Sequence, residues 1–293
     1  MKKIIVLGGT GMLGHQLFKS GLQMGFEMEA IVRNKKLLIE KTNTEFADRI
    51  HVIDDVKGIT QLEILLKALN PDFVVNCIGI VKQSPLTNNY TETIAINSLL
   101  PHQLEGLGSQ LGFKLIHIST DCVFDGQKGM YKETDFSNAT DLYGKSKYLG
   151  EVNYGSGLTI RTSIIGHEIT PTTFGLIDWF LAQEGKVNGF TKAIFSGLTT
   201  LELSRVILNH IIPLNLESGL YQIAAEPINK YDLLSLTARI YKKQIEIMPS
   251  DELVIDRSLD GSRFNLMTGY KVPSWEILIQ EMHEDSLKKK TVR

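Results

Sequence analysis

A short run of glycines after the first apolar segment constrains the fold of this chain more than any other feature. Lys3–Leu7 is rich in β-branched residues and predicts a buried strand, and Gly8-Gly9-Thr10-Gly11-Met12-Leu13-Gly14 follows it directly. Residues 12–24 carry apolar side chains at spacing acceptable for a helix. A glycine loop between a strand and a helix lets the backbone approach a pyrophosphate, whose charge then lies at the helix N-terminus. A plain turn is the alternative, but the flanking elements favour dinucleotide binding through Gly8, Thr10, Gly11, Met12, Leu13 and Gly14.

Apolar runs and amphipathic stretches alternate through the first half of the chain. Further strands are predicted at 28–32, 73–75 and 115–118, and helices at 61–69 and 94–107. Parallel strands need crossover helices, and the chain supplies one at almost every step. The sequence therefore predicts an α/β fold, a Rossmann-type doubly wound parallel sheet with helices on both faces and a small C-terminal substrate-binding lobe.

The second half is less regular. Helices are predicted at 201–212, 231–241 and 275–282, and a strand at 220–223. No internal repeat or long linker separates this part from the first. We expect residues 1–166 to form an NAD(P)-binding domain that carries the catalytic groups. Residues 167–293 are expected to form mostly a substrate-binding lobe, with segments that return to the sheet.

Composition narrows the classes of partner. The 293 residues are 43% hydrophobic and 22% charged, typical of a globular chain, and 31 basic against 33 acidic residues give a net charge of -2. This balance gives no electrostatic reason to expect nucleic acid or an anionic membrane as a partner. Two cysteines fit a reducing compartment, and the apolar run after Met1-Lys2-Lys3 stops at Gly8, short of a signal core. We expect a cytoplasmic protein without a bound metal, and a monomer or a homodimer.

The end of the second predicted strand bears on the choice of cofactor. An NAD site usually places a carboxylate there to accept from the ribose 2′-hydroxyl. This chain has Arg33-Asn34, followed by two lysines. Cations suit the 2′-phosphate of NADP, although a solvated basic turn would have the same composition. The sequence therefore predicts NADPH, with NADH as a possible second cofactor.

A tyrosine and a lysine are placed to handle a proton. Tyr143 and Lys147 lie four residues apart, so on a helix they face the same side. A phenol titrates near ~10 in water, and a neighbouring ammonium lowers this value toward working pH. Thr120, at the end of a predicted strand, can hydrogen-bond the same substrate oxygen. These three residues predict acid–base chemistry at a carbonyl group.

The motifs around these residues resemble a known family. Ser119-Thr120-Asp121-Cys122-Val123-Phe124-Asp125-Gly126 is close to the S-T-D-Y-V-F-D-G of the dTDP-4-dehydrorhamnose reductases, which are extended short-chain dehydrogenases/reductases. Tyr143-Gly144-Lys145-Ser146-Lys147, with Gly150-Glu151 behind it, also matches. The resemblance is strong to about Gly166 and loose beyond it. It implies that Thr120, Tyr143 and Lys147 are the catalytic residues of an NADPH-dependent reductase in dTDP-rhamnose and polysaccharide biosynthesis.

The resemblance also implies contacts to the cofactor and the substrate. The implied cofactor contacts beyond the glycine loop and Arg33 are Asp55, Val56, Cys77, Ile78, Gly79, Asn97, Ser119, Tyr143, Lys147, Thr162 and Ser163. The implied contacts to a nucleotide-linked 4-keto-6-deoxysugar are Lys82, Thr120, Asp121, Cys122, Val123 and Arg257. Arg257 would bind a diphosphate, and a surface salt bridge is an equal alternative. Hydride would pass to the C4 ketone, with Tyr143 as the proton donor.

Departures from the family pattern leave other activities open. Cys122 replaces the usual aromatic residue, and residues 76–83 replace an N-A-A-A-Y-T-like segment, so the sugar or its nucleotide can differ. Dehydratases of this superfamily carry T-D-E, whereas Cys122 follows Thr120-Asp121 here, which argues against dehydration. An epimerase that retains its cofactor, and a non-catalytic NADP-binding regulatory subunit, remain alternatives.

Overall fold

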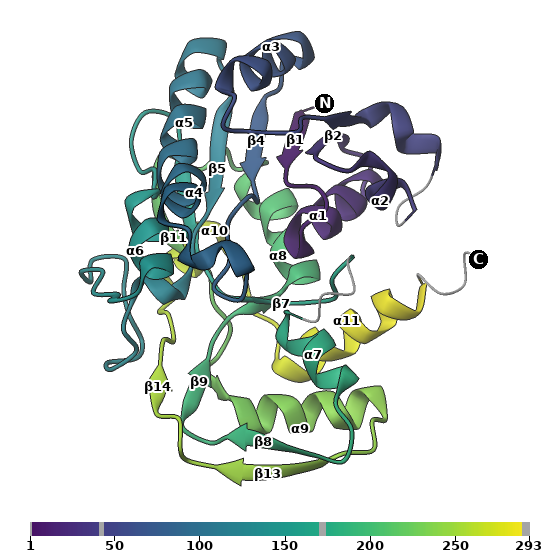
Figure 1. The fold of residues 1–293 in the computed structure, drawn as a ribbon, viewed down its shortest axis with the longest axis vertical. Helices are drawn as coiled ribbons and strands as arrows, with labels where there is room; N and C mark the ends of the chain where they lie inside the picture. The colour runs from purple at the N-terminus through teal and green to yellow at the C-terminus, as the bar shows by residue number, and fades with distance from the viewer. Residues whose placement is uncertain (1, 41–43, 170–173, 289–293) are drawn as a thin grey trace.

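A sheet of seven parallel strands forms the centre of the protein (Figure 1). The structure is a computed structural model that describes residues 2–40, 44–169 and 174–288. The strands lie in the order β11 (Gly219–Gln222), β6 (Leu158–Arg161), β5 (Lys114–Ile118), β4 (Phe73–Asn76), β1 (Lys3–Leu7), β2 (Glu27–Val32) and β3 (Ile50–Val52). The chain winds outward in both directions from β1, in which Val6 pairs with Ala30 of β2 and Val75 of β4. The predicted doubly wound Rossmann-type sheet is confirmed.

Helices cover both faces of the sheet because the strand side chains alternate between two cores. Ile4 and Val6 belong to a core shared with α1 (Met12–Gln23), α8 (Thr200–Val206) and α10 (Ser262–Thr268). Ile5 and Leu7 belong to a second core on the other face, shared with α3 (Ile59–Leu69) and α5 (Leu100–Leu111). Burial on both faces explains why the central strands are continuous apolar runs.

The helix predicted at 94–107 is longer and is interrupted. Its first turns are α4 (Tyr90–Ile94), which begins after Asn89, whose side chain accepts from the Glu92 amide. A π-helical turn at Ala95–Leu99 then leads into α5. Pro101 has no amide hydrogen to donate to the carbonyl group one turn earlier, which accounts for a change of helical geometry at this point.

Short elements complete the first half. They are α2 (Lys35–Ile39), α6 (Leu142–Leu149), and 3₁₀ turns at Thr44–Arg49, Pro85–Asn88 and Asp121–Val123. Helix α6 carries Tyr143 and Lys147 on one side, as their spacing predicts. It begins at Asp141, whose carboxylate accepts from the Gly144 amide at 2.9 Å.

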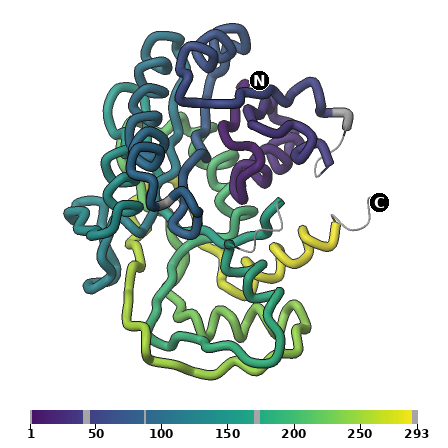
Figure 2. The backbone as a smooth tube through the Cα atoms, in the orientation of Figure 1, coloured from purple at the N-terminus to yellow at the C-terminus, as the bar shows by residue number. Residues whose placement is uncertain are grey.

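The chain beyond β6 forms small sheets and helices below the central sheet, and some segments return to it (Figures 1 and 2). The small sheets pair β7 (Ile164–Ile165) with β10 (Leu198–Thr199), β8 (Lys186–Phe190) with β13 (Glu246–Ser250), and β9 (Ala193–Phe195) with both β12 (Ile228–Asn229) and β14 (Ile255–Asp256). The remaining helices are α7 (Leu176–Ala182), α9 (Lys230–Tyr241) and α11 (Trp275–Lys288).

Two helices of the second half differ from the sequence prediction. The segment predicted as one helix at 201–212 is α8 followed by a π-helical turn at Ile207–Ile211. Helix α11 continues to Lys288, past the predicted end at 282, with charged residues in its added turns. Among the described ranges, no helix combines the length and the apolar character needed to cross a lipid bilayer.

Candidate active site

The loop between β1 and α1 consists of three glycines and Thr10. Gly8 has φ +82°, and a Cβ atom at Gly14 would collide with the Gly8 carbonyl oxygen. The Gly11 amide donates to that oxygen at 2.8 Å, and no side chain caps the first turn of α1. A Cβ atom at Gly11 would meet only the same oxygen, at 3.3 Å. The first backbone amides of α1, at Met12 and Leu13, are therefore not covered by a capping side chain. This arrangement suits a pyrophosphate.

The predicted cofactor residues beyond the loop lie at the ends of neighbouring strands. Arg33 is exposed directly after β2, and the side chain of Asn34 accepts from the Leu37 amide and caps α2. Asp55 is exposed after β3, and its carboxylate accepts from the Lys57 amide at 2.9 Å. Val56 packs against the second core. The carboxyl ends of parallel strands meet at one edge of the sheet, where ligands of such folds bind.

Asn97 positions the segment after β4. Its buried side chain accepts from the Ile80 amide at 2.8 Å and donates to the Ile80 carbonyl at 3.0 Å. It also donates to the Ser146 hydroxyl of α6 at 3.2 Å. These bonds hold the stretch that contains Cys77, Ile78 and Gly79, and a Cβ atom at Gly79 would lie 4.0 Å from the Lys147 amine. Asn97 therefore orders the backbone beside Lys147.

The Thr120 hydroxyl lies beside that of Tyr143 at the centre of the site, close enough to affect the pKa of Tyr143. Thr120 is buried at the end of β5, where its hydroxyl donates to Asp121 at 3.1 Å and accepts from the Cys122 amide at 3.1 Å. Burial raises the pKa of Tyr143 above its ordinary value, the nearby Cys122 thiol adds to the increase, and the Thr120 hydroxyl opposes it. Tyr143 is therefore held in its protonated form.

The Lys147 amine bonds to β5 and not to these hydroxyl groups. It is 4% exposed, donates to the Ile118 carbonyl at 2.7 Å, and lies 3.2 Å from Nε2 of His117. Burial lowers the pKa of Lys147 to about 8. Lys147 is not among the main influences on the pKa of Tyr143. The sequence-based expectation of an ammonium that lowers the Tyr143 pKa is therefore not met by this conformation.

A buried ion pair fixes the strand ends under the site. Arg161 donates to both carboxylate oxygens of Glu151 at 2.7 Å, and both side chains are less than a tenth exposed. The Ser119 hydroxyl donates to the same carboxylate at 2.8 Å. The Asp121 amide donates to the Thr162 carbonyl, and Thr162 leads to half-buried Ser163. Ser119 and Thr162 thus order the backbone on either side of β5 and β6.

The C-terminal lobe brings two cations to the same place. Arg257 is half-buried next to β14, donates to the Phe124 carbonyl at 2.7 Å, and has its guanidinium group 3.9 Å from the Cys122 sulfur. Lys230 begins α9 and interacts electrostatically with both Asp121 and Cys122. Burial raises the pKa of Asp121, and both cations oppose that shift. Sequence reasoning missed Lys230 because it looks like any first residue of a helix.

Two other predicted substrate residues have structural partners. Lys82 is half exposed and pairs with Asp141, the cap of α6, at 3.1 Å. Val123 is fully buried and packs in a small core with Phe124. Lys82 can reach a ligand by leaving its ion pair, whereas Val123 serves packing.

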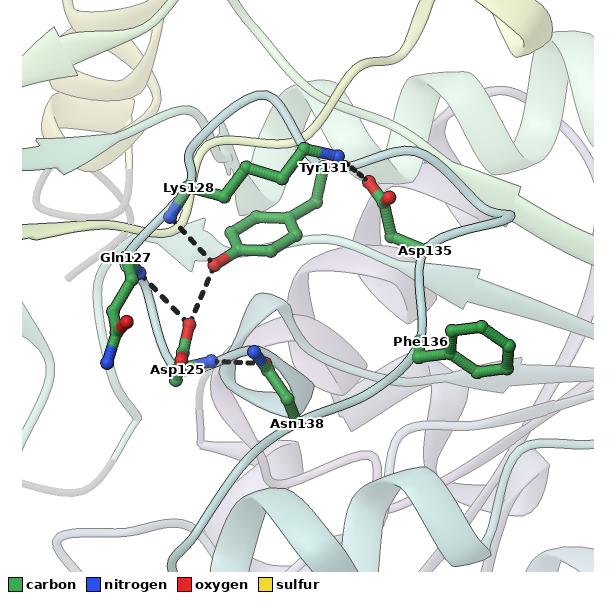
Figure 3. Close-up of a pocket in the computed structure, with 7 residues that line it drawn as sticks. All are labelled: Asp125, Gln127, Lys128, Tyr131, Asp135, Phe136 and Asn138. Atoms are coloured by element: carbon green, nitrogen blue, oxygen red, sulfur yellow. Dashed lines mark hydrogen bonds and ion pairs between the residues drawn. The ribbon is translucent and has the colours of Figure 1, made fainter.

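A cavity of about 350 Å³ lies in the loop that follows this core, and none of the predicted catalytic residues lines it. Figure 3 shows Tyr131 among the lining residues, with its hydroxyl donating to Asp125 at 2.8 Å, while Phe136 lies apart from the hydrogen-bonded group. Lys128 and Asp135 form an ion pair across the same loop. The hydrogen bonds within this pocket stabilise the loop that leads from Thr120 to α6.

The central sheet, the glycine loop at its first crossover and the hydroxyl pair beside the strand ends together define a Rossmann-type α/β protein with a site for a nucleotide. A family model described as RmlD substrate binding domain matches residues 1–165, more than half of the chain. The chain belongs to this family, and the resemblance found in its motifs is confirmed.

Individual relatives are distant. The chain is 29% identical to methionine adenosyltransferase 2 subunit beta of Danio rerio over 51% of this chain and 42% of the relative. It is 26% identical to dTDP-4-dehydrorhamnose reductase of Mycobacterium tuberculosis over 51% and 44%. These matches span less than half of the relatives' length. The crystal structure of dTDP-4-dehydrorhamnose reductase from Bacillus anthracis in complex with NADP has a TM-score of 0.80 at 19% identity, covers 98% of this chain and 100% of that one, and so shares the fold.

Proposed function

We propose that this chain is an NADPH-dependent reductase of a nucleotide-linked 4-keto-6-deoxysugar, and that NADH can serve as a second reductant. The observation that carries the proposal is the pair of neighbouring hydroxyl groups of Thr120 and Tyr143, with Lys147 one turn further along α6. The pair lies at the strand ends that also carry the glycine loop and Arg33. Two hydroxyl groups that meet in this way can hold one carbonyl oxygen between them.

The cofactor residues fit a dinucleotide. The uncapped amides of α1 would hold the pyrophosphate, and Gly11 leaves the backbone bare on that side. Arg33 would hold the 2′-phosphate, and Gly79 and Lys147 lie side by side where the nicotinamide ribose would reach the site. When bound, NADPH supplies a hydride to the carbonyl carbon.

The side chains of this chain then handle the oxygen and its proton. The O–H bond of Tyr143 breaks, and its proton passes to the oxygen that gains charge as the ketone is reduced. Thr120 donates a hydrogen bond to the same oxygen. The raised pKa of Tyr143 keeps the proton in place until that charge develops. A protonated Lys147 would stabilise the phenolate that is left.

The cations of the lobe suit an anionic substrate. Arg257 and Lys230 flank the buried Asp121 and Cys122 beside Thr120. Lys82 reaches toward the start of α6 from the other side. We propose that Arg257 and Lys230 hold the diphosphate of the nucleotide sugar, with Asp121 and Cys122 near the sugar.

A panel assay tests the reaction. Purified protein is mixed with NADPH and several 4-keto nucleotide sugars, and oxidation of NADPH is followed at the same time as product formation. Stoichiometric oxidation with one of these sugars supports the reductase. An epimerase would change the sugar stereochemistry without net consumption of NADPH.

Cofactor choice is tested at Arg33. Arg33→Asp removes a charged hydrogen bond and adds repulsion, so NADPH binding should weaken by a few kcal/mol and NADH binding far less. Isothermal titration calorimetry with both cofactors measures the difference. Lys67→Asp, an equal charge change at an exposed residue of α3, is the matched control. Equal losses for both cofactors in Arg33→Asp would show that Arg33 does not contact the 2′-phosphate.

A regulatory subunit is the second candidate. It is favoured by the match to the relative named methionine adenosyltransferase 2 subunit beta. Protein that binds NADPH but oxidises it with none of the sugars would support this alternative.

A further inference from the structure

A buried histidine lies directly behind Lys147 and has no part in the reaction described above. His117 is in the middle of β5 and is fully inaccessible to solvent. Its Nδ1 atom is 3.1 Å from Nδ2 of Asn76 on β4, and its Nε2 atom is 3.2 Å from the Lys147 amine. The three side chains form one buried polar chain that ends at the proposed catalytic lysine.

A backbone amide sets the direction of the hydrogen bonds between these three side chains. The Ile78 N–H can only donate, and it donates to Oδ1 of Asn76 at 3.0 Å. Nδ2 of Asn76 is therefore the atom that faces His117, and it donates to Nδ1. A neutral imidazole whose Nδ1 accepts must carry its hydrogen on Nε2. That hydrogen points at Lys147.

An ammonium group has no lone pair with which to accept this hydrogen bond, whereas an amine has one. We propose that His117 is a positioning residue that donates its Nε2 hydrogen to Lys147 and so favours the uncharged amine form of Lys147. The amine donates one hydrogen to the Ile118 carbonyl and has a second free for the site. Lys147 must then take up a proton before it can stabilise a phenolate.

The electrostatic surroundings agree with this arrangement. Burial lowers the pKa of Lys147, and Glu151 and Cys77 act in the opposite direction. Burial also holds the pKa of His117 well below its ordinary value, and Lys147 and His102 of α5 lower it further. His117 therefore stays neutral, and Lys147 is the one of these three side chains that changes its charge.

The first measurement needs no variant and no cofactor. Nitrogen-15 NMR of the full chain, at a pH well above the Lys147 midpoint, distinguishes the two neutral forms of His117, with His117→Gln used only to assign the signals. We expect hydrogen on Nε2 and none on Nδ1. Hydrogen on Nδ1 would overturn the proposal, because Nε2 could then accept from an ammonium.

Two variants test the consequence for Lys147. Asn76→Asp keeps an acceptor for the Ile78 amide and replaces Nδ2 with a second carboxylate oxygen. That oxygen accepts from Nδ1–H of His117, so the direction of the hydrogen bonds is reversed and Nε2 of His117 becomes an acceptor for Lys147. His117→Leu removes the Nε2 donor without adding a charge. In both variants the NMR titration midpoint of Lys147, at or below about 8 in the wild type, should move toward the ordinary value of about 10.4. A shift in Asn76→Asp alone would mean a simple charge effect and would overturn the proposal. If neither variant folds, the tautomer of the wild type still decides.

The consequence for catalysis rests on the proposed reductase. Activity should fall as pH rises through the Lys147 midpoint, and this limb of the pH profile should move to higher pH in His117→Leu. Absence of reductase activity would reject the proposed function and leave the NMR result unaffected. An unmoved limb in an active His117→Leu enzyme, despite a shifted Lys147 titration, would show that Lys147 charge does not limit the reaction.

Discussion

Tyr143 and Lys147 lie one turn apart on α6, yet their surroundings favour the neutral form of both. Burial raises the pKa of the phenol and lowers that of the amine. The two groups do not form an ion pair with each other, because Lys147 is bonded to Ile118 and His117 instead of to Tyr143. The surroundings of Tyr143 therefore keep the tyrosine protonated.

Replacing Tyr143 separates chemistry from binding. Tyr143→Phe removes the proton donor and keeps the ring, so turnover should fall by about 10²–10⁴-fold, with folding and NADPH binding retained. Steady-state kinetics and calorimetry measure the two quantities. Because Tyr143 and Lys147 act as a unit, the double variant with Lys147→Met should be little worse than the poorer single variant. Turnover of Tyr143→Phe close to wild type would favour the regulatory alternative.

Lys147 should also affect how stability depends on pH. Its pKa is about 8 in the folded protein and 10.5 for an unperturbed lysine. Between these pH values the unfolded chain binds more protons at this position than the folded chain, so the free energy of unfolding rises with pH. Relative to Lys147→Met, the wild type should gain on the order of a few kcal/mol across this range, as measured by urea unfolding. A difference that stays constant with pH would contradict a lowered lysine pKa.

At the scale of elements, one close contact sets the angle between β1 and α1. The backbone of Gly14 on α1 packs against the Gly8 carbonyl, and no side chain fits between them. This contact brings the first turn of the helix to the strand end, where its amides meet a ligand. The glycine spacing therefore serves packing and binding together.

Gly14→Ala should disturb both. The added methyl group meets backbone and not a movable side chain, so α1 must shift, and stability should fall by about 1–3 kcal/mol with loss of NADPH affinity. Gly106→Ala is the matched control, since Gly106 lies on α5 with nothing within 4 Å of the added Cβ. That change should raise stability by up to about 1 kcal/mol. Calorimetric melting and NADPH titration of both variants give the comparison, and equal behaviour of the two would contradict the packing argument.

On the scale of the whole molecule, the last helix joins the lobe to the central sheet. Leu278 of α11 belongs to the same core as Ile4 of β1, and Ile279 belongs to a core of the lobe. Lys19 of α1 pairs with Asp285 at 2.7 Å, although 266 residues separate them. We propose that the region 1–166 and the lobe formed by 167–293 unfold as one unit.

Leu278→Ala tests this coupling. It leaves a cavity in the core that includes β1, so the free energy of unfolding should fall by about 2–5 kcal/mol in a single transition. Ile277→Ala, at a neighbouring side chain that is 50% exposed, should change it by less than about 0.5 kcal/mol. Urea unfolding followed by both fluorescence and circular dichroism measures the transition. Two separate transitions in Leu278→Ala would show that the lobe unfolds on its own.

The sequence alone determined the parallel sheet and the places where the chain turns at its edge. Apolar runs, glycine spacing and the Tyr143–Lys147 interval are local patterns with fixed periods, so they identify strands, the first crossover and one face of α6. The apolar periodicity did not place the π-helical turn before Pro101, because that turn interrupts the helix without changing its apolar pattern.

Only the tertiary structure decided which side chains share the site. Lys230 and Arg257 reach Asp121 across more than a hundred residues of sequence; the family resemblance pointed to Arg257, but no local pattern marks Lys230. The direction of the hydrogen bonds behind Lys147 likewise depends on β4 lying beside β5, which brings Asn76 to His117. Charge and protonation in a buried site depend on neighbours in space, and the folded chain alone sets those neighbours.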